Sequence, residues 1–345
     1  MIFNFPIGVP RYAFQRLAVL LLAVFAIGQS TAADQVLAVQ GPTMGTAYHV
    51  KWIAADDTHR AQIKQQIDAL LVDINQQMST YIKDSELSLF NAAPSDTQRK
   101  VSAELYEVLS LAQQISERTH GAYDISVGPL VNLWGFGPKG RITKAPSDAD
   151  IAAVRARVGY QKLSLLADQT IAKSAPLYLD LSSIAKGYAV DKLAQLLESR
   201  GVKAYLVEIG GELRTLGTKP NGADWRIAIE SPTAGRTIQK IVDVSNIAVA
   251  TSGDYRNYFE QDGVRYSHTI DTQTGKPVSH NLASVTVLAV DCATADALAT
   301  SFLAMGTERA LEYATKHAIE AFFIIKEPSG FVEKMTAGFA ARVVQ

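Results

Sequence analysis

Two side chains in the C-terminal third of the sequence have the types and spacing to ligate a cation. Asp296 and Thr300 are four residues apart in residues 294–305, which we predict to be a helix, so the two side chains share one face. A carboxylate and a hydroxyl oxygen suit a hard cation such as Mg²⁺. Pairs of this kind are also common in helices that bind nothing, so the spacing alone leaves both interpretations open.

A second candidate is the segment Asp-Leu-Ser-Ser-Ile-Ala-Lys-Gly at residues 180–187, which joins a predicted strand to a predicted helix. We expect Ser182 or Ser183 to cap that helix. The N–H groups at a helix start favour an anion such as a pyrophosphate. A capped helix without any ligand is the commoner explanation of such a sequence.

Two further features could contribute to a site, and a third is expected to be structural. His268 precedes a turn-like segment at residues 274–277, and it could act as a general base near neutral pH or simply form a structural hydrogen bond. The Gly-Gly pair between Glu208 and Glu212 permits close approach of a ligand, although a plain turn explains it equally well. The single cysteine, Cys292, is expected to be a buried small residue.

Several common catalytic motifs are missing. The sequence has no Gly-x-Gly-x-x-Gly after a strand, no Gly-x-x-x-x-Gly-Lys-Ser/Thr loop, no His-Glu-x-x-His and no Gly-x-Ser-x-Gly. A nucleotide would therefore need a site unlike a Rossmann or P-loop site. Zinc hydrolase and serine hydrolase chemistry are not expected.

The elements that must position these residues are strands and helices in mixed order. Strands are predicted at residues 36–54 (one or two), 204–209, 225–230, 247–251, 283–290 and 319–325. Helices are predicted from Asp57 to Met78, from a Ser102 cap to about Gly121, and over residues 147–158, 184–200, 294–305 and 307–317. Residues 121–137 are rich in glycine and aromatic side chains, and we predict an irregular binding loop there. Because strict βαβ alternation is absent, we expect an α+β fold.

The N-terminus has the pattern of a secretory signal peptide. Arg11 and Arg16 precede an apolar run at residues 17–27, and small residues follow up to Ala33. The run is short for a membrane-spanning helix, although an uncleaved anchor is the alternative. We therefore expect a signal peptide over residues 1–33, one domain over residues 34–345 and a periplasmic location, without lipid anchoring because no Cys follows the run.

Charge and cysteine content narrow the possible partners. The chain has 33 Lys+Arg and 34 Asp+Glu, a net charge of −1. Removing residues 1–33 removes two Arg and no acid, so the exported chain would carry −3. This balance argues against nucleic acid and against stable insertion into a membrane surface. One cysteine permits no internal disulfide.

Seven segments together resemble a known family. They are Gly-Pro-Thr-Met-Gly-Thr at 41–46, Met-Ser-Thr-Tyr at 78–81, Gly-Ala-Tyr-Asp-Ile-Ser-Val-Gly-Pro-Leu at 121–130, residues 180–187, residues 208–212, Ser-His-Thr-Ile-Asp at 267–271 and Ala-Asp-Ala-Leu-Ala-Thr at 295–300. Their types and order resemble the ApbE family of FAD:protein FMN transferases over residues 40–325. The resemblance implies an α+β fold of two closely packed subdomains around a flavin nucleotide. It also implies a Mg²⁺-dependent enzyme that moves FMN from its substrate FAD to a Thr or Ser hydroxyl of a partner protein and releases AMP.

The resemblance also implies a role for individual residues. FAD would be contacted by Met44, Tyr81, Ala122, Tyr123, Asp124, Asp180, Lys186 and Ile270. Mg²⁺ would be bound by the side chains of Asp296 and Thr300 and the backbone carbonyl of Ser183, and His268 matches the family's histidine in the transfer step. Acceptors in the family are subunits of redox-driven ion pumps and related flavoproteins with a Ser-Gly/Ala-Ala-Thr motif.

Two departures from the family pattern and two alternative functions accompany this interpretation. Many members have Gly-Ala where this chain has Ser182-Ser183, and some have an acid where it has Lys186. A Mg²⁺-dependent FAD pyrophosphatase would use the same site with water as the acceptor. A non-catalytic FAD carrier would have little need of Asp296, Thr300 and His268 together.

Overall fold

The computed structural model describes residues 34–142, 144–232, 238–254, 258–261 and 263–344. The predicted signal peptide, residues 1–33, lies outside the described residues. Within these ranges no helix is both long enough and apolar enough to cross a membrane.

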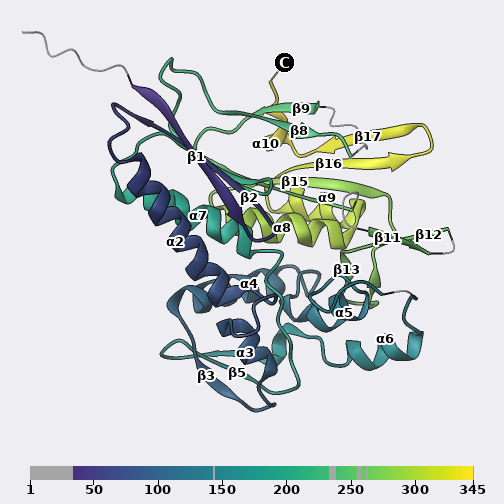
Figure 1. Cartoon of the computed structure of the whole chain (residues 1–345). Helices are drawn as coiled ribbons and strands as arrows, with labels where there is room; N and C mark the ends of the chain where they lie inside the picture. Colours follow the sequence, from purple (N-terminus) through teal and green to yellow (C-terminus); the bar gives the residue numbers. More distant parts are fainter. Residues whose placement is uncertain (1–33, 143, 233–237, 255–257, 262, 345) are drawn as a thin grey trace, which may run out of the picture.

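The central element is an eight-stranded sheet in which every neighbouring pair of strands is antiparallel. Figure 1 shows this sheet in the upper half of the molecule. In spatial order its strands are β1 (Gln35–Thr43), β2 (Thr46–Ala54), β6 (Tyr205–Ile209), β7 (Glu212–Leu216), β10 (Ala248–Gly253), β15 (Leu282–Ala289), β16 (Glu320–Glu327) and β17 (Gly330–Met335).

Four helices cover one face of the sheet. They are α2 (Arg60–Met78), α7 (Ala185–Ser199), α8 (Cys292–Met305) and α9 (Thr307–Lys316). Side chains alternate across a strand, so Tyr48, Val50 and Trp52 of β2 are buried toward these helices while His49 and Lys51 face the other way. By the same alternation, the residues of β6 and β10 that belong to the main core face the helices.

A two-stranded hairpin covers part of the opposite face. Its strands are β8 (Arg226–Glu230) and β9 (Ile238–Asp243), and the short helix α10 (Ala337–Ala340) lies beside it (Figure 1). Ile229, Leu213, Val249 and Phe322 belong to the separate apolar core between the hairpin and the sheet.

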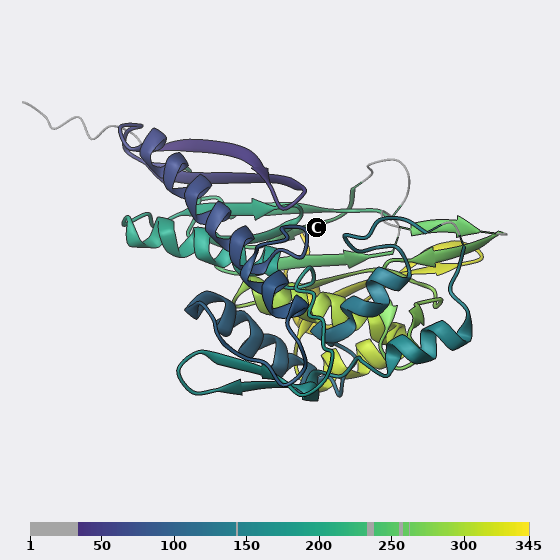
Figure 2. The same ribbon diagram turned by 60° about the horizontal axis from the view of Figure 1, so that its bottom comes forward.

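The layer below the helices is built from shorter elements, which Figure 2 brings forward. The helices are α3 (Glu86–Ala92), α4 (Ala103–Arg118), η1 (Ile125–Val127), α5 (Gly128–Leu133), α6 (Asp148–Arg155) and η2 (Tyr160–Lys162). The strands are β3 (Gln98–Lys100), β5 (Thr170–Lys173) and β4 (Leu163–Leu166) in one sheet, with the pairs β11 (Tyr258–Gln261)–β12 (Val264–Ser267) and β13 (Ile270–Asp271)–β14 (Lys276–Pro277). One continuous core joins this layer to the sheet, since Leu105 and Leu163 belong to the same cluster as Val50 and Phe302.

The predicted α+β class is confirmed. Most predicted strands and helices are present, and Ser102 caps α4 by accepting a hydrogen bond from the Leu105 N–H. The prediction of an irregular loop over residues 121–137 is wrong over residues 125–133, where η1 and α5 form. Pro129 lies in the first turn of α5, a position that suits the fixed backbone angle of proline.

Candidate active site

One cavity of about 940 Å³ gathers the predicted site residues. It lies between α7, α8, the loop before η1 and the central sheet. Its lining includes Tyr81, Ala122, Tyr123, Asp124, Asp180, Ser183, Lys186, His268, Ile270, Asp296 and Thr300. These residues come from segments that are up to 219 positions apart, and the fold brings them to a single site.

Met44 is the predicted residue that does not line the cavity. It occupies the turn between β1 and β2 with a φ of +47°, an unusual value for a residue other than glycine. Its half-buried side chain packs against the main core. Contact between Met44 and FAD therefore stays a prediction from the resemblance.

The centre of the cavity is a buried charged cluster on the helical side of the sheet. Lys186 Nζ lies 2.8 Å from Glu212 Oε1 and 3.8 Å from Asp296 Oδ2. Burial raises the pKa of Glu212 to about 7 despite the nearby lysine, and burial also raises the pKa of Asp296. Glu212 Oε2 has no hydrogen-bond partner, so this cluster has spare acceptor capacity.

The predicted serine cap of α7 is wrong. The N-cap residue is Ile184, which provides no side-chain hydrogen bond. Ser182 instead donates its hydroxyl to Asp180 Oδ1 at 2.5 Å, and Ser183 Oγ lies 3.1 Å from the Tyr123 hydroxyl. The Gly187 N–H in the first turn of α7 donates to Asp296 Oδ2 at 3.1 Å, so this N–H binds a protein carboxylate rather than being free for the predicted pyrophosphate.

The cavity lining is suited to a divalent cation. Among the described lining residues there are six carboxylates, namely Asp124, Asp180, Glu208, Glu212, Glu230 and Asp296, and one lysine. Thr300 Oγ1 lies 3.1 Å from Ser252 Oγ, so hydroxyl oxygens lie one helical turn from the Asp296 carboxylate. Carboxylates that line the cavity disfavour a pyrophosphate, and a bound Mg²⁺ would reduce that repulsion. The residues present therefore fit a Mg²⁺ site.

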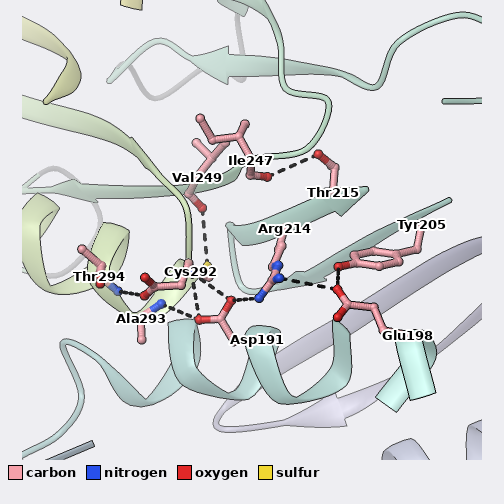
Figure 3. Close-up of polar contacts among 11 residues, drawn as sticks. Asp191, Glu198, Tyr205, Arg214, Thr215, Ile247, Val249, Cys292, Ala293 and Thr294 are labelled. Carbon is pink, nitrogen blue, oxygen red and sulfur yellow. Dashed lines mark hydrogen bonds and ion pairs between the residues drawn. The ribbon is translucent and has the colours of Figure 1, made fainter. Parts of the chain in front are cut away.

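The junction of α7 and α8 fixes the positions of these groups (Figure 3). The Asp191 carboxylate on α7 accepts hydrogen bonds from the N–H groups of Cys292 and Ala293, at 2.8 and 2.9 Å, at the start of α8. Arg214 of β7 pairs with the same carboxylate at 3.0 Å. Cys292 is fully buried, as predicted, and its thiol pKa is raised well above the usual value by that burial. The helix that carries Asp296 is thus tied to the helix that carries Lys186.

The side of the cavity below α7 and α8 is lined mainly by aromatic side chains and by a loop held by hydrogen bonds to backbone N–H groups. Asp124 accepts hydrogen bonds from the N–H groups of Ser126 and Tyr160, at 2.8 and 2.9 Å, which makes its carboxylate a support for the loop. Tyr81 is 66% exposed at the rim. The His268 ring lies edge-on to Phe136 with centroids 6.3 Å apart.

For several residues that line the cavity, no role was predicted from the sequence. His49 Nδ1 lies 2.6 Å from Glu208 Oε2, within hydrogen-bond distance, while Glu212 and Ser252 lie near Lys186 and Thr300. The Glu-Ile-Gly-Gly-Glu segment was the available signal for Glu208 and Glu212. Nothing local marks His49 or Ser252, because strand pairing brings them to the site.

This fold and this cavity define a candidate enzyme site with acid–base and oxygen-ligand groups. Comparison with known proteins specifies the family. The ApbE family profile matches residues 44–323. The chain therefore belongs to the ApbE family.

Individual relatives agree with that assignment. The chain is 47% identical over 304 residues to the FAD:protein FMN transferase of Vibrio cholerae, covering 87% of this chain and 91% of that relative. It is 39% identical to the FAD:protein FMN transferase of Escherichia coli K12, covering 96% and 98%. The apo flavinyl transferase ApbE of Pseudomonas stutzeri superposes with a TM-score of 0.84 at 44% identity, covering 90% and 97%. These relatives confirm the prediction of a flavin transferase enzyme of this family.

Proposed function

We propose that this protein transfers FMN from FAD to a Thr or Ser hydroxyl of an acceptor flavoprotein and releases AMP, with Mg²⁺ bound at Asp296, Thr300 and the Ser183 carbonyl. One observation carries the proposal. Asp296, Thr300, Lys186 and His268 line a single cavity with the residues matched to FAD contacts. A carrier without turnover would need neither an oxygen-ligand set nor a base beside its nucleotide.

The bond changes are those of a phosphoryl substitution. The acceptor oxygen forms a bond to the phosphorus on the FMN side, and the bond from that phosphorus to the bridging oxygen breaks. AMP leaves with the bridging oxygen and its electron pair. The cation, when bound, neutralises charge that develops on the phosphate oxygens.

The protein's own residues orient the reacting groups and remove the proton of the acceptor hydroxyl. Lys186 supplies the positive side chain of the cavity, and Glu212 holds its ammonium group at 2.8 Å. His268 would accept the hydroxyl proton as the oxygen–phosphorus bond forms, which typically contributes about 10²–10⁴-fold to a rate. The nucleophile belongs to the acceptor, so the enzyme needs no catalytic Ser or Cys of its own.

The cellular setting is part of the proposal. The signal-peptide pattern at residues 1–33 supports export to the periplasm. The acceptor would carry a Ser-Gly/Ala-Ala-Thr type motif, as the family resemblance implies, and would be a redox-driven ion pump subunit or a related flavoprotein.

The test combines the exported chain, FAD, Mg²⁺ and an acceptor protein with a Ser-Gly-Ala-Thr segment. After denaturing electrophoresis, flavin fluorescence on the acceptor band and AMP in the same tube are measured. We expect equal amounts of both, lost when a chelator is added. AMP and free FMN without a fluorescent band would support the pyrophosphatase, and bound FAD without either product would support the carrier.

A further inference from the structure

The cavity has linings on both faces of the central sheet. Lys186, Glu212 and Ser252 lie on the face that the helices cover. The opposite lining comes from His49 and Glu208, with Leu206, Leu213, Val249 and Thr251, all on alternate positions that face the β8–β9 hairpin. Two approaches therefore lead to the charged centre, one on each face.

The passage between the two faces follows from strand pairing. β7 pairs with β10 only at Leu213–Val249 and Arg214–Ala248. Glu212, the residue before Leu213, is paired with Ile209 of β6 but has no partner on β10, and its side chain contacts Lys186. The Gly210–Gly211 turn that closes the β6–β7 hairpin also lines the cavity. The cavity thus passes around this turn, where the two strands are no longer bonded.

The approach on the hairpin face is bounded by one edge of β8. Four consecutive residues, 227–230, line the cavity. Side chains alternate along a strand, so four in a row means that the strand presents its edge. In the described part of the chain β8 pairs only with β9, which leaves its other edge unpaired.

The hydrogen-bond pattern shows which backbone groups that edge offers. Ile241, opposite Ala228 on β9, accepts a hydrogen bond from Val344, and the Val244 N–H bonds to Trp225 across the hairpin. The backbone groups of Ile241 therefore point away from β8, and those of Ala228 point away from β9 in the antiparallel pattern. The Ala228 N–H and C=O are left at the edge beside the cavity.

We propose that the acceptor polypeptide binds as an extended strand along this edge of β8 and brings its hydroxyl around the Gly210–Gly211 turn to the charged centre. The occupant follows from the chemistry, because the second substrate of an FAD:protein FMN transferase is a protein whose hydroxyl must reach the pyrophosphate. The residues matched to FAD lie on the helical side, which leaves the hairpin side for the acceptor. An edge strand binds an extended segment through its own backbone groups, with side-chain pockets providing selectivity. This inference rests on the proposed function.

The test is Ala228→Pro, which removes the edge N–H while the hydrogen bonds between β8 and β9 are kept. The acceptor KM should rise at least about fivefold, because one or more hydrogen bonds to the acceptor are lost. The FAD dissociation constant should stay within twofold. Val36→Pro is the matched control. The Ile53 N–H, opposite Val36, bonds to Ala204 of the neighbouring segment, so the Val36 N–H points to the free edge of β1, away from the cavity.

A second measurement covers the case in which Ala228→Pro fails to fold. An acceptor peptide is N-methylated at one position at a time, and the wild-type KM should rise at alternate positions, as strand pairing requires. An unchanged acceptor KM in folded Ala228→Pro, no alternation along the peptide, or an equal loss of FAD affinity would overturn the inference. Absence of transfer by the wild-type chain would instead contradict the proposed function.

Discussion

The Gly187 N–H and the Asp296 carboxylate are joined by a hydrogen bond of 3.1 Å, and this contact sets the distance between α7 and α8. A side chain at position 187 would have no room. Its Cβ would lie 2.3 Å from the Cys292 carbonyl oxygen and 2.8 Å from Ala293 Cα. Glycine at this position therefore lets the helix with Lys186 approach the helix with Asp296.

Gly187→Ala should separate the two helices. We expect a loss of about 1–3 kcal/mol in the free energy of unfolding, the usual range for overpacking, and weaker Mg²⁺ binding by the folded fraction. Urea unfolding and calorimetric Mg²⁺ titration measure the two effects. Gln195→Ala, at an exposed position of the same helix, is the control. If Gly187→Ala kept the stability and the Mg²⁺ affinity of the wild type, that result would contradict the close packing of α7 against α8.

Asp296→Asn tests the cation assignment with little change in shape. The amide keeps an acceptor for the Gly187 N–H but removes the charge, so Mg²⁺ affinity should fall at least about tenfold while FAD is still retained. Calorimetric titration with Mg²⁺ alone and equilibrium dialysis with FAD separate these effects. Exposed Asp73→Asn serves as the control. Equal Mg²⁺ affinities in the Asp296 variant and the wild type would remove Asp296 from the ligand set.

Glu212→Gln should change the pH dependence of stability. Folded Glu212 keeps its proton to about pH 7, against an ordinary pKa of 4.5, because the group is buried. Folding therefore takes up a proton between these values, and stability falls as the pH rises through that window, by up to about 1.4 kcal/mol per pH unit.

Urea unfolding at pH 5, 6 and 7 without Mg²⁺ measures this slope. It should become shallower in Glu212→Gln. Glu333→Gln is the control. Burial acts to raise the pKa of Glu333, but hydrogen bonds from Gln239 and Lys240 outweigh it and lower the pKa, so this group titrates below the window. Parallel slopes for wild type and Glu212→Gln would show that Glu212 is ionised throughout.

His268→Ala tests the proton acceptor. We expect transfer to slow by about 10²–10⁴-fold while the FAD dissociation constant stays within twofold, because a general base acts on the transition state. Single-turnover transfer and equilibrium dialysis give the two values, and exposed His59→Ala is the control. A rate close to that of the wild type would make His268 a structural residue.

The sequence allowed the fold class to be predicted, and every predicted site residue except Met44 lines one cavity, since helical periodicity and ordered motifs are local signals. The start of α7 was mispredicted because one local side-chain contact and one contact from a distant helix decide it. Ser182 bonds to Asp180, and a carboxylate from α8 takes a helix N–H. His49 and Ser252 were missed for a related reason. Their places depend on strand pairing between distant segments, which no local pattern contains.

The central claim is that a protein hydroxyl, rather than water, attacks the phosphorus on the FMN side. The most direct measurement runs the reaction in water enriched in ¹⁸O and analyses all products by mass spectrometry. We predict flavinylated acceptor and AMP that both lack ¹⁸O, in equal amounts. Free FMN or AMP that contains ¹⁸O as the main product, with the acceptor unmodified, would contradict the account and identify a hydrolase.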